Sequence, residues 1–257
     1  MVCVYDSGVG GLTALSALRA AAPSADIVYL GDTARVPYGT RSEGTVQAYT
    51  RAALDHLAAL SPEAVLVACG TVSTVALPSL RSRYSFPIFG VADAGIGAAL
   101  AGAPHGRIAV LGTEATVRSG YFGKKIRERR PCAEVREIAC QLFVALAECG
   151  FTGEEDPVPA LISERYLAPL FGMRPEAILL GCTHFPWLSR HIARLFPSAA
   201  LIDCGAAAAA SLAGLLSAGG GSTEYLVTDS PEQFSSALLS LTGRPPRGRV
   251  KRISLST

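Results

Sequence analysis

The sequence predicts an α/β protein with parallel sheets, in a chain of 257 residues that is long enough for two domains. Two observations predict this fold class. Short apolar runs alternate with amphipathic segments along the chain, which is the rhythm of βαβ units. Small, polar or nucleophilic residues follow several of these runs directly, as they do at the ligand-binding edge of a parallel sheet.

Seven apolar runs have the length and composition of buried strands. They are Val2–Tyr5, Ile27–Leu30, Ala64–Ala68, Ile88–Val91, Ile108–Leu111, Ala177–Leu180 and Ala200–Ile202. We expect helices between them at Leu12–Ala21, Ser42–Leu60, Gly120–Arg130 and Ser189–Phe196. Because a parallel crossover usually contains a helix, this order predicts sheets covered on both faces.

Composition and charge exclude several classes of function. With 49% hydrophobic and 17% charged residues, the chain has the make-up of a compact globular enzyme. A net charge of +2 provides no overall field for nucleic acid or for an anionic membrane, so we expect neither partner. The uncharged stretch Cys204–Gly221 is mostly Ala and Gly, which favours a buried helix over a membrane span. No basic segment followed by an apolar one opens the chain, which predicts a cytoplasmic protein.

The seven cysteines form no CxxC pair and no zinc-ligand spacing, so we expect neither a disulfide framework nor a metal site. Free cysteines are most often small buried hydrophobes. We interpret five of the seven in this way: Cys3, Cys132, Cys140, Cys149 and Cys204.

Cys69 and Cys182 differ from the other five, because each directly follows or nearly follows a buried run and precedes a threonine. The turns Ala68-Cys69-Gly70-Thr71 and Gly181-Cys182-Thr183-His184 resemble each other, which hints at two equivalent halves. We expect each thiol to lie near a helix N-terminus, where the helix dipole lowers the pKa of a thiol. Such a thiol can act as a base near neutral pH.

Two more strand-end residues are candidates for the same chemistry. His184 lies two residues after Cys182 and is a candidate proton partner for that thiol. Asp6 follows the first strand and could serve either in the site or as a helix N-cap.

Other motifs are weaker. Gly8-Val9-Gly10-Gly11 partly imitates a dinucleotide-binding fingerprint, but Thr13 stands where its third glycine belongs, which disfavours a nicotinamide cofactor. What remains is a helix N-terminus that can bind an anion such as a carboxylate. Among the basic stretches, Lys124–Arg130 has helical spacing and predicts a solvated helix face, and Arg244–Arg252 predicts a mobile tail.

Taken in order, five segments of the chain resemble the signatures of bacterial glutamate racemases. They are Asp6–Leu12, Tyr29–Gly39, Cys69-Gly70-Thr71, Leu180–Pro186 and Leu201–Gly205. Val110–Thr113 with Ser119-Gly120, and Phe143–Gly150, also fit, so that the resemblance covers nearly the whole chain.

The resemblance implies two doubly wound, pseudo-symmetric α/β domains with the active site in the cleft between them. One would combine residues 1–92 with 204–257, and the other would hold residues 93–203. It further implies a cytoplasmic bacterial homodimer that interconverts L- and D-glutamate for peptidoglycan synthesis, without pyridoxal phosphate, metal or any other cofactor.

The resemblance also implies roles for individual residues. Cys69 would deprotonate D-glutamate with Asp6 tuning it, and Cys182 would deprotonate L-glutamate with His184 and Glu148 tuning it. Two bases are needed because racemisation removes the α-proton from one face of the carbon and returns one to the other. The substrate would be held by Asp6, Ser7, Pro37, Tyr38, Gly39, Gly70, Thr71, Thr183 and His184.

One departure from the family pattern affects the site. The family usually has Asn after the first catalytic cysteine, and this chain has Gly70. Loss of one hydrogen bond to the substrate costs about 1–3 kcal/mol, or roughly 10- to 100-fold in rate. Two alternatives therefore stay open: a racemase of another acidic amino acid such as aspartate, and a degenerate homologue that binds a partner.

Overall fold

The computed structural model describes residues 1–256. The chain begins with β1 (Val2–Asp6), α1 (Leu12–Ala21), β2 (Ile27–Gly31), α2 (Glu43–Ala58), β3 (Ala64–Val67), α3 (Gly70–Val75), α4 (Leu77–Leu80), η1 (Arg81–Arg83), β4 (Ile88–Gly90) and α5 (Val91–Gly102). It continues with β5 (Arg107–Gly112), α6 (Glu114–Ser119), α7 (Tyr121–Arg129), β6 (Glu134–Ala139), α8 (Leu142–Glu148), α9 (Pro157–Leu167), η2 (Ala168–Leu170), β7 (Ala177–Leu180), η3 (Phe185–Leu188), α10 (Ser189–Leu195) and β8 (Ala200–Asp203). It closes with α11 (Cys204–Ala213), β9 (Thr223–Val227), α12 (Pro231–Thr242) and β10 (Val250–Arg252).

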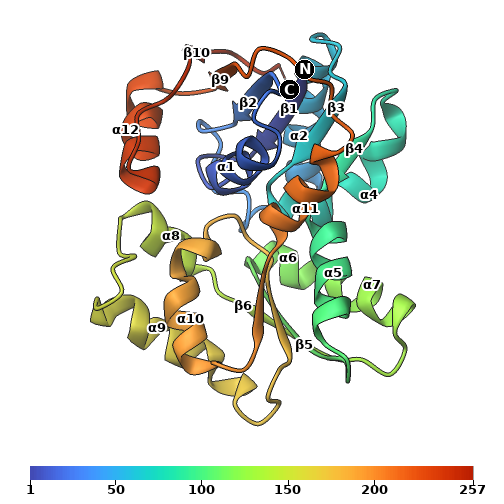
Figure 1. Ribbon diagram of the computed structural model, residues 1–257, viewed down its shortest axis with the longest axis vertical. Coiled ribbons are helices and arrows are strands. Elements are labelled where there is room, and N and C mark those ends of the chain that lie inside the picture. The colour runs from blue at the N-terminus through green and yellow to red at the C-terminus, as the bar shows by residue number, and fades with distance from the viewer. Residues whose placement is uncertain (257) are drawn as a thin grey trace.

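The strands form two sheets in which every strand pair is parallel. The first has the order β10-β9-β2-β1-β3-β4, and the second has the order β6-β5-β7-β8. Within each sheet, the first four strands in chain order therefore take the same arrangement, second-first-third-fourth. The predicted α/β class, with two doubly wound parallel sheets, is confirmed, and the two sheets lie one above the other in Figure 1.

We call each sheet with its covering helices one half of the molecule. The helices that follow the fourth strands link the two halves. After β4 of the first sheet, α5 packs against β7 and β8 of the second sheet. After β8 of the second sheet, α11 returns to pack against α1, β3 and β4 of the first, and it also lies against α5, as Figure 1 shows. Asp203 begins α11 by accepting hydrogen bonds from the N–H groups of Gly205 and Ala206.

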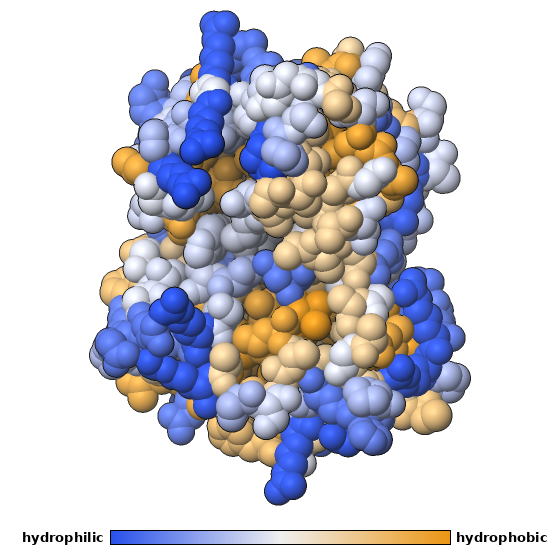
Figure 2. Space-filling model, viewed as in Figure 1, coloured by the Kyte–Doolittle hydropathy of each residue, from blue (hydrophilic) through white to orange (hydrophobic). Residues whose placement is uncertain are grey.

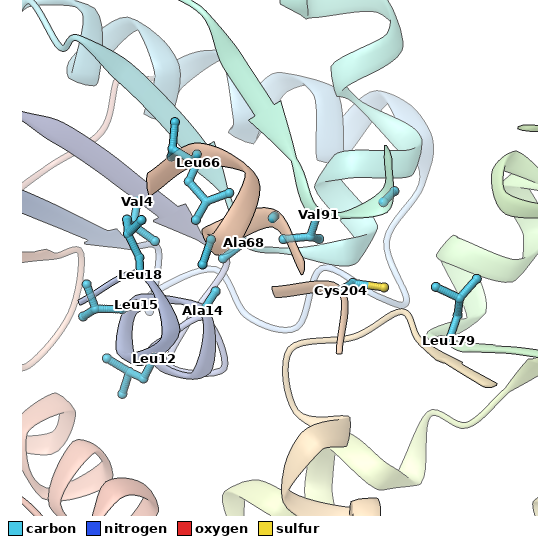
Figure 3. Packing of buried hydrophobic residues seen from close by; sticks show 14 of the residues in the cluster. Val4, Leu12, Ala14, Leu15, Leu18, Leu66, Ala68, Val91, Leu179 and Cys204 are labelled. Atoms are coloured by element: carbon cyan, nitrogen blue, oxygen red, sulfur yellow. The ribbon is translucent and has the colours of Figure 1, made fainter. Parts of the chain in front are cut away.

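One buried apolar cluster extends through both halves. It includes Val4 of β1 and Leu66 of β3, the inward side of α1, and Leu179 of β7 in the second sheet. Figure 3 shows Cys204, at the start of α11, between the residues of the first sheet and Leu179. On the face drawn in Figure 2, tan and orange surface lies along the middle, and strongly hydrophilic residues lie at the upper left, on both flanks of the lower half and at the bottom.

All seven predicted strands exist, with ends that differ by one residue or coincide. Three strands were not predicted: β6, β9 and β10. β6 carries Glu and Arg at three of its six positions, and β10 is short and basic. The predicted mobile tail was wrong in part, since Val250–Arg252 pair with β9. A helix does form within Cys204–Gly221, but it ends at Ala213.

Two of the cysteines that we expected to be buried, Cys132 and Cys149, are exposed, whereas Cys3, Cys140 and Cys204 are buried. Both exposed cysteines lie outside strands, Cys132 in a turn and Cys149 at the end of α8, so no sheet covers them. Within residues 1–256, no helix is long and apolar enough to cross a membrane. The boundaries expected at residues 92/93 and 203/204 stay a prediction, and residue 257 of that division lies outside the described residues.

Candidate active site

The two singled-out thiols occupy equivalent places in the two halves. Cys69 lies two residues beyond β3, the third strand of the first sheet, and Cys182 lies two residues beyond β7, the third strand of the second. Both side chains line the same small cavity, of about 30 Å³. Ligands of parallel sheets bind at the carboxyl ends of the strands, and this cavity lies at the carboxyl ends of both sheets.

The cavity brings together almost every predicted site residue. Its lining consists of Ser7, Gly8, Val36, Pro37, Tyr38, Gly39, Cys69, Gly70, Thr71, Thr113, Gln141, Val144, Glu148, Cys182, Thr183 and His184. Asp6 is the one predicted residue outside this lining, and it lies buried beneath it.

Cys69 is the N-cap residue of α3, as the strand-to-helix turn predicts. Its thiol is 5% exposed and lies 3.4 Å from the Ser7 hydroxyl. Burial, reinforced by the nearby charge of Asp6, raises the pKa of Cys69 to about 12. The expected lowering of this pKa was therefore wrong, because desolvation by burial is the largest effect on this thiol.

Asp6 ends β1 and is fully buried. One carboxylate oxygen, Oδ2, accepts a hydrogen bond of 2.9 Å from the N–H of Gly8. Asp6 is not the N-cap of α1, since that helix begins after Gly11. Burial raises the pKa of Asp6, although the proximity of His184 works in the opposite direction. Its Oδ1 is buried without a hydrogen-bond partner among residues 1–256.

Cys182 belongs to a chain of three groups that runs from the cavity to the surface. Its Sγ lies 3.6 Å from Nδ1 of His184, and Nε2 of His184 lies 3.0 Å from Oε1 of Glu148. The His184 side chain is 8% exposed and that of Glu148 is 41% exposed. Burial lowers the pKa of His184, but the hydrogen bonds to Cys182 and Glu148 outweigh this effect and raise it above its usual value. The helix after Cys182 is a short 3₁₀-helix that begins at Phe185, so no α-helix N-terminus lies at this thiol.

Tyr38 lines the cavity, and its hydroxyl interacts with other buried residues of the first half. The hydroxyl donates to Asp32 and lies 3.2 Å from the hydroxyl of Tyr5. Asp32 is fully buried and also accepts from Arg35 and Thr228. This network holds the segment that carries Pro37 and Gly39 at the cavity, and it uses the proton of the Tyr38 hydroxyl.

Close backbone contacts join the two halves around the cavity. A Cβ atom at position 70 would overlap the carbonyl oxygen of Gly181, directly before Cys182. A Cβ atom at Gly10 would overlap the hydroxyl of Thr183. The hydroxyls of Thr71 and Thr113 lie 2.9 Å apart, and the N–H of Ala115 donates to the carbonyl of Gly39 at 2.8 Å. The cavity is small because the halves meet at these points.

Sequence reasoning did not find Gly8, Val36, Thr113, Gln141 and Val144 as site residues. Thr113 directly follows β5 and is the N-cap residue of α6, as Cys69 is of α3, so the strand-end rule already pointed to it. Gln141 lies two residues beyond β6, a strand whose charged residues hid it from the apolar pattern. No group of three or more His, Cys, Asp or Glu side chains within the described chain is placed to hold a metal ion.

Known proteins resemble this chain in both sequence and fold. The Asp/Glu/hydantoin racemase family model matches residues 13–212. This chain belongs to the Asp/Glu/hydantoin racemase family. A glutamate racemase of Aquifex aeolicus is 39% identical over 248 residues, 96% of each chain. One of Chlorobaculum tepidum is 41% identical over 232 residues, which cover 90% of this chain and 83% of that one.

A solved structure of this racemase family matches the fold as well. The glutamate racemase of Francisella tularensis, solved in complex with D-glutamate, has a TM-score of 0.91 and 30% identity to this chain. The match covers 99% of this chain and 97% of that one. The resemblance inferred from the sequence motifs is therefore confirmed at the level of the family and of the fold.

Proposed function

We propose that this protein is a glutamate racemase in which Cys69 and Cys182 exchange the α-proton of the substrate. The observation that carries the proposal is the placement of the two thiols on equivalent strand ends of two sheets, lining one cavity. Each thiol has its own polar partners: Asp6 and Ser7 lie near Cys69, and the His184–Glu148 pair stands behind Cys182. The related proteins that carry the name glutamate racemase support the choice of substrate.

In each turnover, one thiolate removes the α-proton of the substrate and the other thiol donates a proton to the opposite face of the α-carbon. From L-glutamate, the Cys182 thiolate takes the α-proton, and the electron pair of the broken C–H bond delocalises into the α-carboxylate. The Cys69 thiol then donates its proton to the opposite face, which yields D-glutamate and leaves Cys69 as the thiolate. The reverse reaction uses the same steps in the opposite order.

The two thiols have different surroundings, which suits the acid role of Cys69 in the first direction. Burial holds Cys69 as a thiol, ready to act as the acid, because its pKa lies near 12. The raised pKa of His184 keeps a positive charge beside Cys182, with Nδ1 of the imidazole 3.6 Å from the sulfur. Asp6 and the His184–Glu148 pair tune the two thiols in this proposal.

Hydroxyl and main-chain groups of the lining hold the substrate. Ser7 reaches it from the turn after β1, Thr71 from α3, and Thr183 with His184 from the Cys182 turn, while Asp6 lies beneath the lining at the end of β1. Pro37, Tyr38 and Gly39 form the wall that the Asp32 network fixes, and Gly70 contributes its main chain. No cofactor takes part in these steps.

We extend the proposal to the setting of the enzyme. A bacterial cytoplasmic homodimer that supplies D-glutamate for peptidoglycan, with domains of residues 1–92 plus 204–257 and 93–203, agrees with the resemblance to the family. Size-exclusion chromatography with light scattering tests the dimer, and D-glutamate auxotrophy of a deletion strain tests the role.

The decisive experiment follows the conversion of each glutamate enantiomer by circular dichroism. We expect the parent protein to convert both, and the Cys69→Ser and Cys182→Ser variants to lose at least about 10³-fold in kcat, because a serine hydroxyl is a far weaker acid than a thiol and its alkoxide form is not populated near neutral pH. Cys132→Ser is the matched control, because Cys132 is exposed and has no role in the proposed mechanism. Aspartate is assayed beside glutamate, since Gly70 lacks the family's amide. Equal activity of parent and both variants would contradict the proposal.

A further inference from the structure

We propose that Gln141 supplies the carboxamide that holds a carboxylate of the substrate, in place of the side chain that Gly70 lacks. This inference rests on the proposed function and names a specificity residue for the same site. Its first support is that position 70 cannot carry a side chain here. A Cβ atom would overlap the carbonyl oxygen of Gly181 and lie 2.9 Å from the carbonyl carbon. Both are main-chain atoms that cannot rotate away.

Gln141 is the one residue with a carboxamide side chain in the described lining of the cavity. It is the N-cap residue of α8, at the carboxyl end of β6, and it is half-buried. The carboxamide therefore belongs to the second half of the molecule, whereas position 70 belongs to the first.

The orientation of the Gln141 side chain is fixed through its oxygen. Oε1 accepts a hydrogen bond of 3.4 Å from the N–H of Glu114 and lies against Gly39, 3.1 Å from where a Cβ would stand. A main-chain N–H can only donate, so the atom it meets must be the oxygen and not the nitrogen. The hydrogen bond from Glu114 uses only Oε1, and Nε2 has no hydrogen-bond partner among residues 1–256, so both of its N–H groups are free.

The charge of the cavity explains why such a donor matters. Glutamate carries two carboxylates, yet no Lys or Arg belongs to the described lining, and His184 is already engaged with Cys182 and Glu148. Carboxylate binding must therefore come from neutral donors. Hydroxyls of Ser7, Thr71, Thr113 and Thr183 are present, but those of Thr71 and Thr113 bind each other. The free N–H groups of Gln141 add two donors to the hydroxyls of Ser7 and Thr183.

The test compares Gln141→Ala and Gln141→Glu with the parent, and uses Gln47→Ala as the control. Gln47 lies on α2 and its amide is bonded to Glu43, away from the cavity. We expect Gln141→Ala to lower kcat/KM for glutamate about 10- to 100-fold, the usual effect of losing a hydrogen bond to a charged group. Gln141→Glu is expected to lose more, because it places a second negative charge beside the carboxylate. Gln47→Ala is expected to match the parent.

Binding is measured separately from turnover, by calorimetry with D-glutamate and by protection of the thiols from iodoacetamide. If the parent binds glutamate without racemising it, the proposed function fails while weaker binding by Gln141→Ala still supports this inference. A Gly70→Asn change in the Gln141→Ala background is expected not to restore binding, because position 70 has no room. Unchanged binding and kcat/KM in Gln141→Ala, or full rescue by Asn at position 70, would overturn the inference.

Discussion

At the scale of single residues, the site separates its two thiols by environment. Cys69 sits in a desolvated position near a carboxylate, and Cys182 sits beside an imidazole whose far nitrogen binds Glu148. Two groups of the same chemical type therefore have different surroundings, and burial raises the pKa of Cys69. The outer member of the relay, Glu148, is partly exposed and so can be altered without opening the core.

A change at Glu148 tests this relay through pH. The Glu148 carboxylate raises the pKa of His184, so Glu148→Gln lets His184 lose its proton at a lower pH. We expect the alkaline limb of the pH profile of kcat/KM to move to lower pH in this variant. Because enantiomers have equal free energy, kcat/KM is the same in both directions, and one profile suffices.

Glu164→Gln, at an exposed position on α9, controls for the loss of one negative charge. Superimposable alkaline limbs for the parent and Glu148→Gln would contradict the role of the relay. Equal shifts in the Glu148 and Glu164 variants would assign the effect to net charge instead.

At the scale of elements, α5 is the helix whose packing joins the halves, and two of its glycines differ in their surroundings. A Cβ at Gly95 would overlap the sulfur of Cys204 and lie 3.0 Å from Leu179, whereas a Cβ at Gly97 meets nothing within 4 Å. Replacing Gly by Ala inside a helix stabilises it by about 1 kcal/mol. Overpacking of a core costs about 1–3 kcal/mol.

We therefore expect Gly97→Ala to stabilise the protein by about 0.5–1 kcal/mol. Gly95→Ala should destabilise it by about 1 kcal/mol, because the clash with α11 outweighs the helix propensity. Urea denaturation measures both free energies of unfolding. A Gly95→Ala protein as stable as Gly97→Ala would show that α5 and α11 are not tightly packed.

The sequence allowed most of these elements to be predicted, and the exceptions have physical reasons. Strands buried on both faces, such as β1, β3 and β7, are continuous apolar runs and were found. Strand β6, with its half-exposed pattern and its charged residues, lacks that signal, and with it Gln141 was missed. The direction of the Cys69 pKa shift was also missed, because burial depends on how the two halves meet and not on the local turn.

At the scale of the whole molecule, the two sheets repeat one strand order and exchange covering helices through α5 and α11. That arrangement brings the carboxyl ends of β3 and β7 to one cavity from opposite sides. The Cys69 and Cys182 turns have similar sequences, and the topology makes them equivalent, because each turn follows the third strand of its sheet in chain order. Glycines at positions 10 and 70 let the halves approach closely, because Gly70 faces the main chain of Gly181 and Gly10 faces the side chain of Thr183.

The central claim is that two thiols act on opposite faces of one carbon, and deuterium labelling in D₂O tests it most directly. L-glutamate is incubated with the protein, and mass spectrometry follows the α-position of both enantiomers at early times. The account predicts deuterium in the D-glutamate formed, while the remaining L-glutamate keeps its protium, because the base that removes the proton is not the acid that returns one. Deuterium appearing in recovered L-glutamate as fast as in the product would indicate a single base, and would contradict the account.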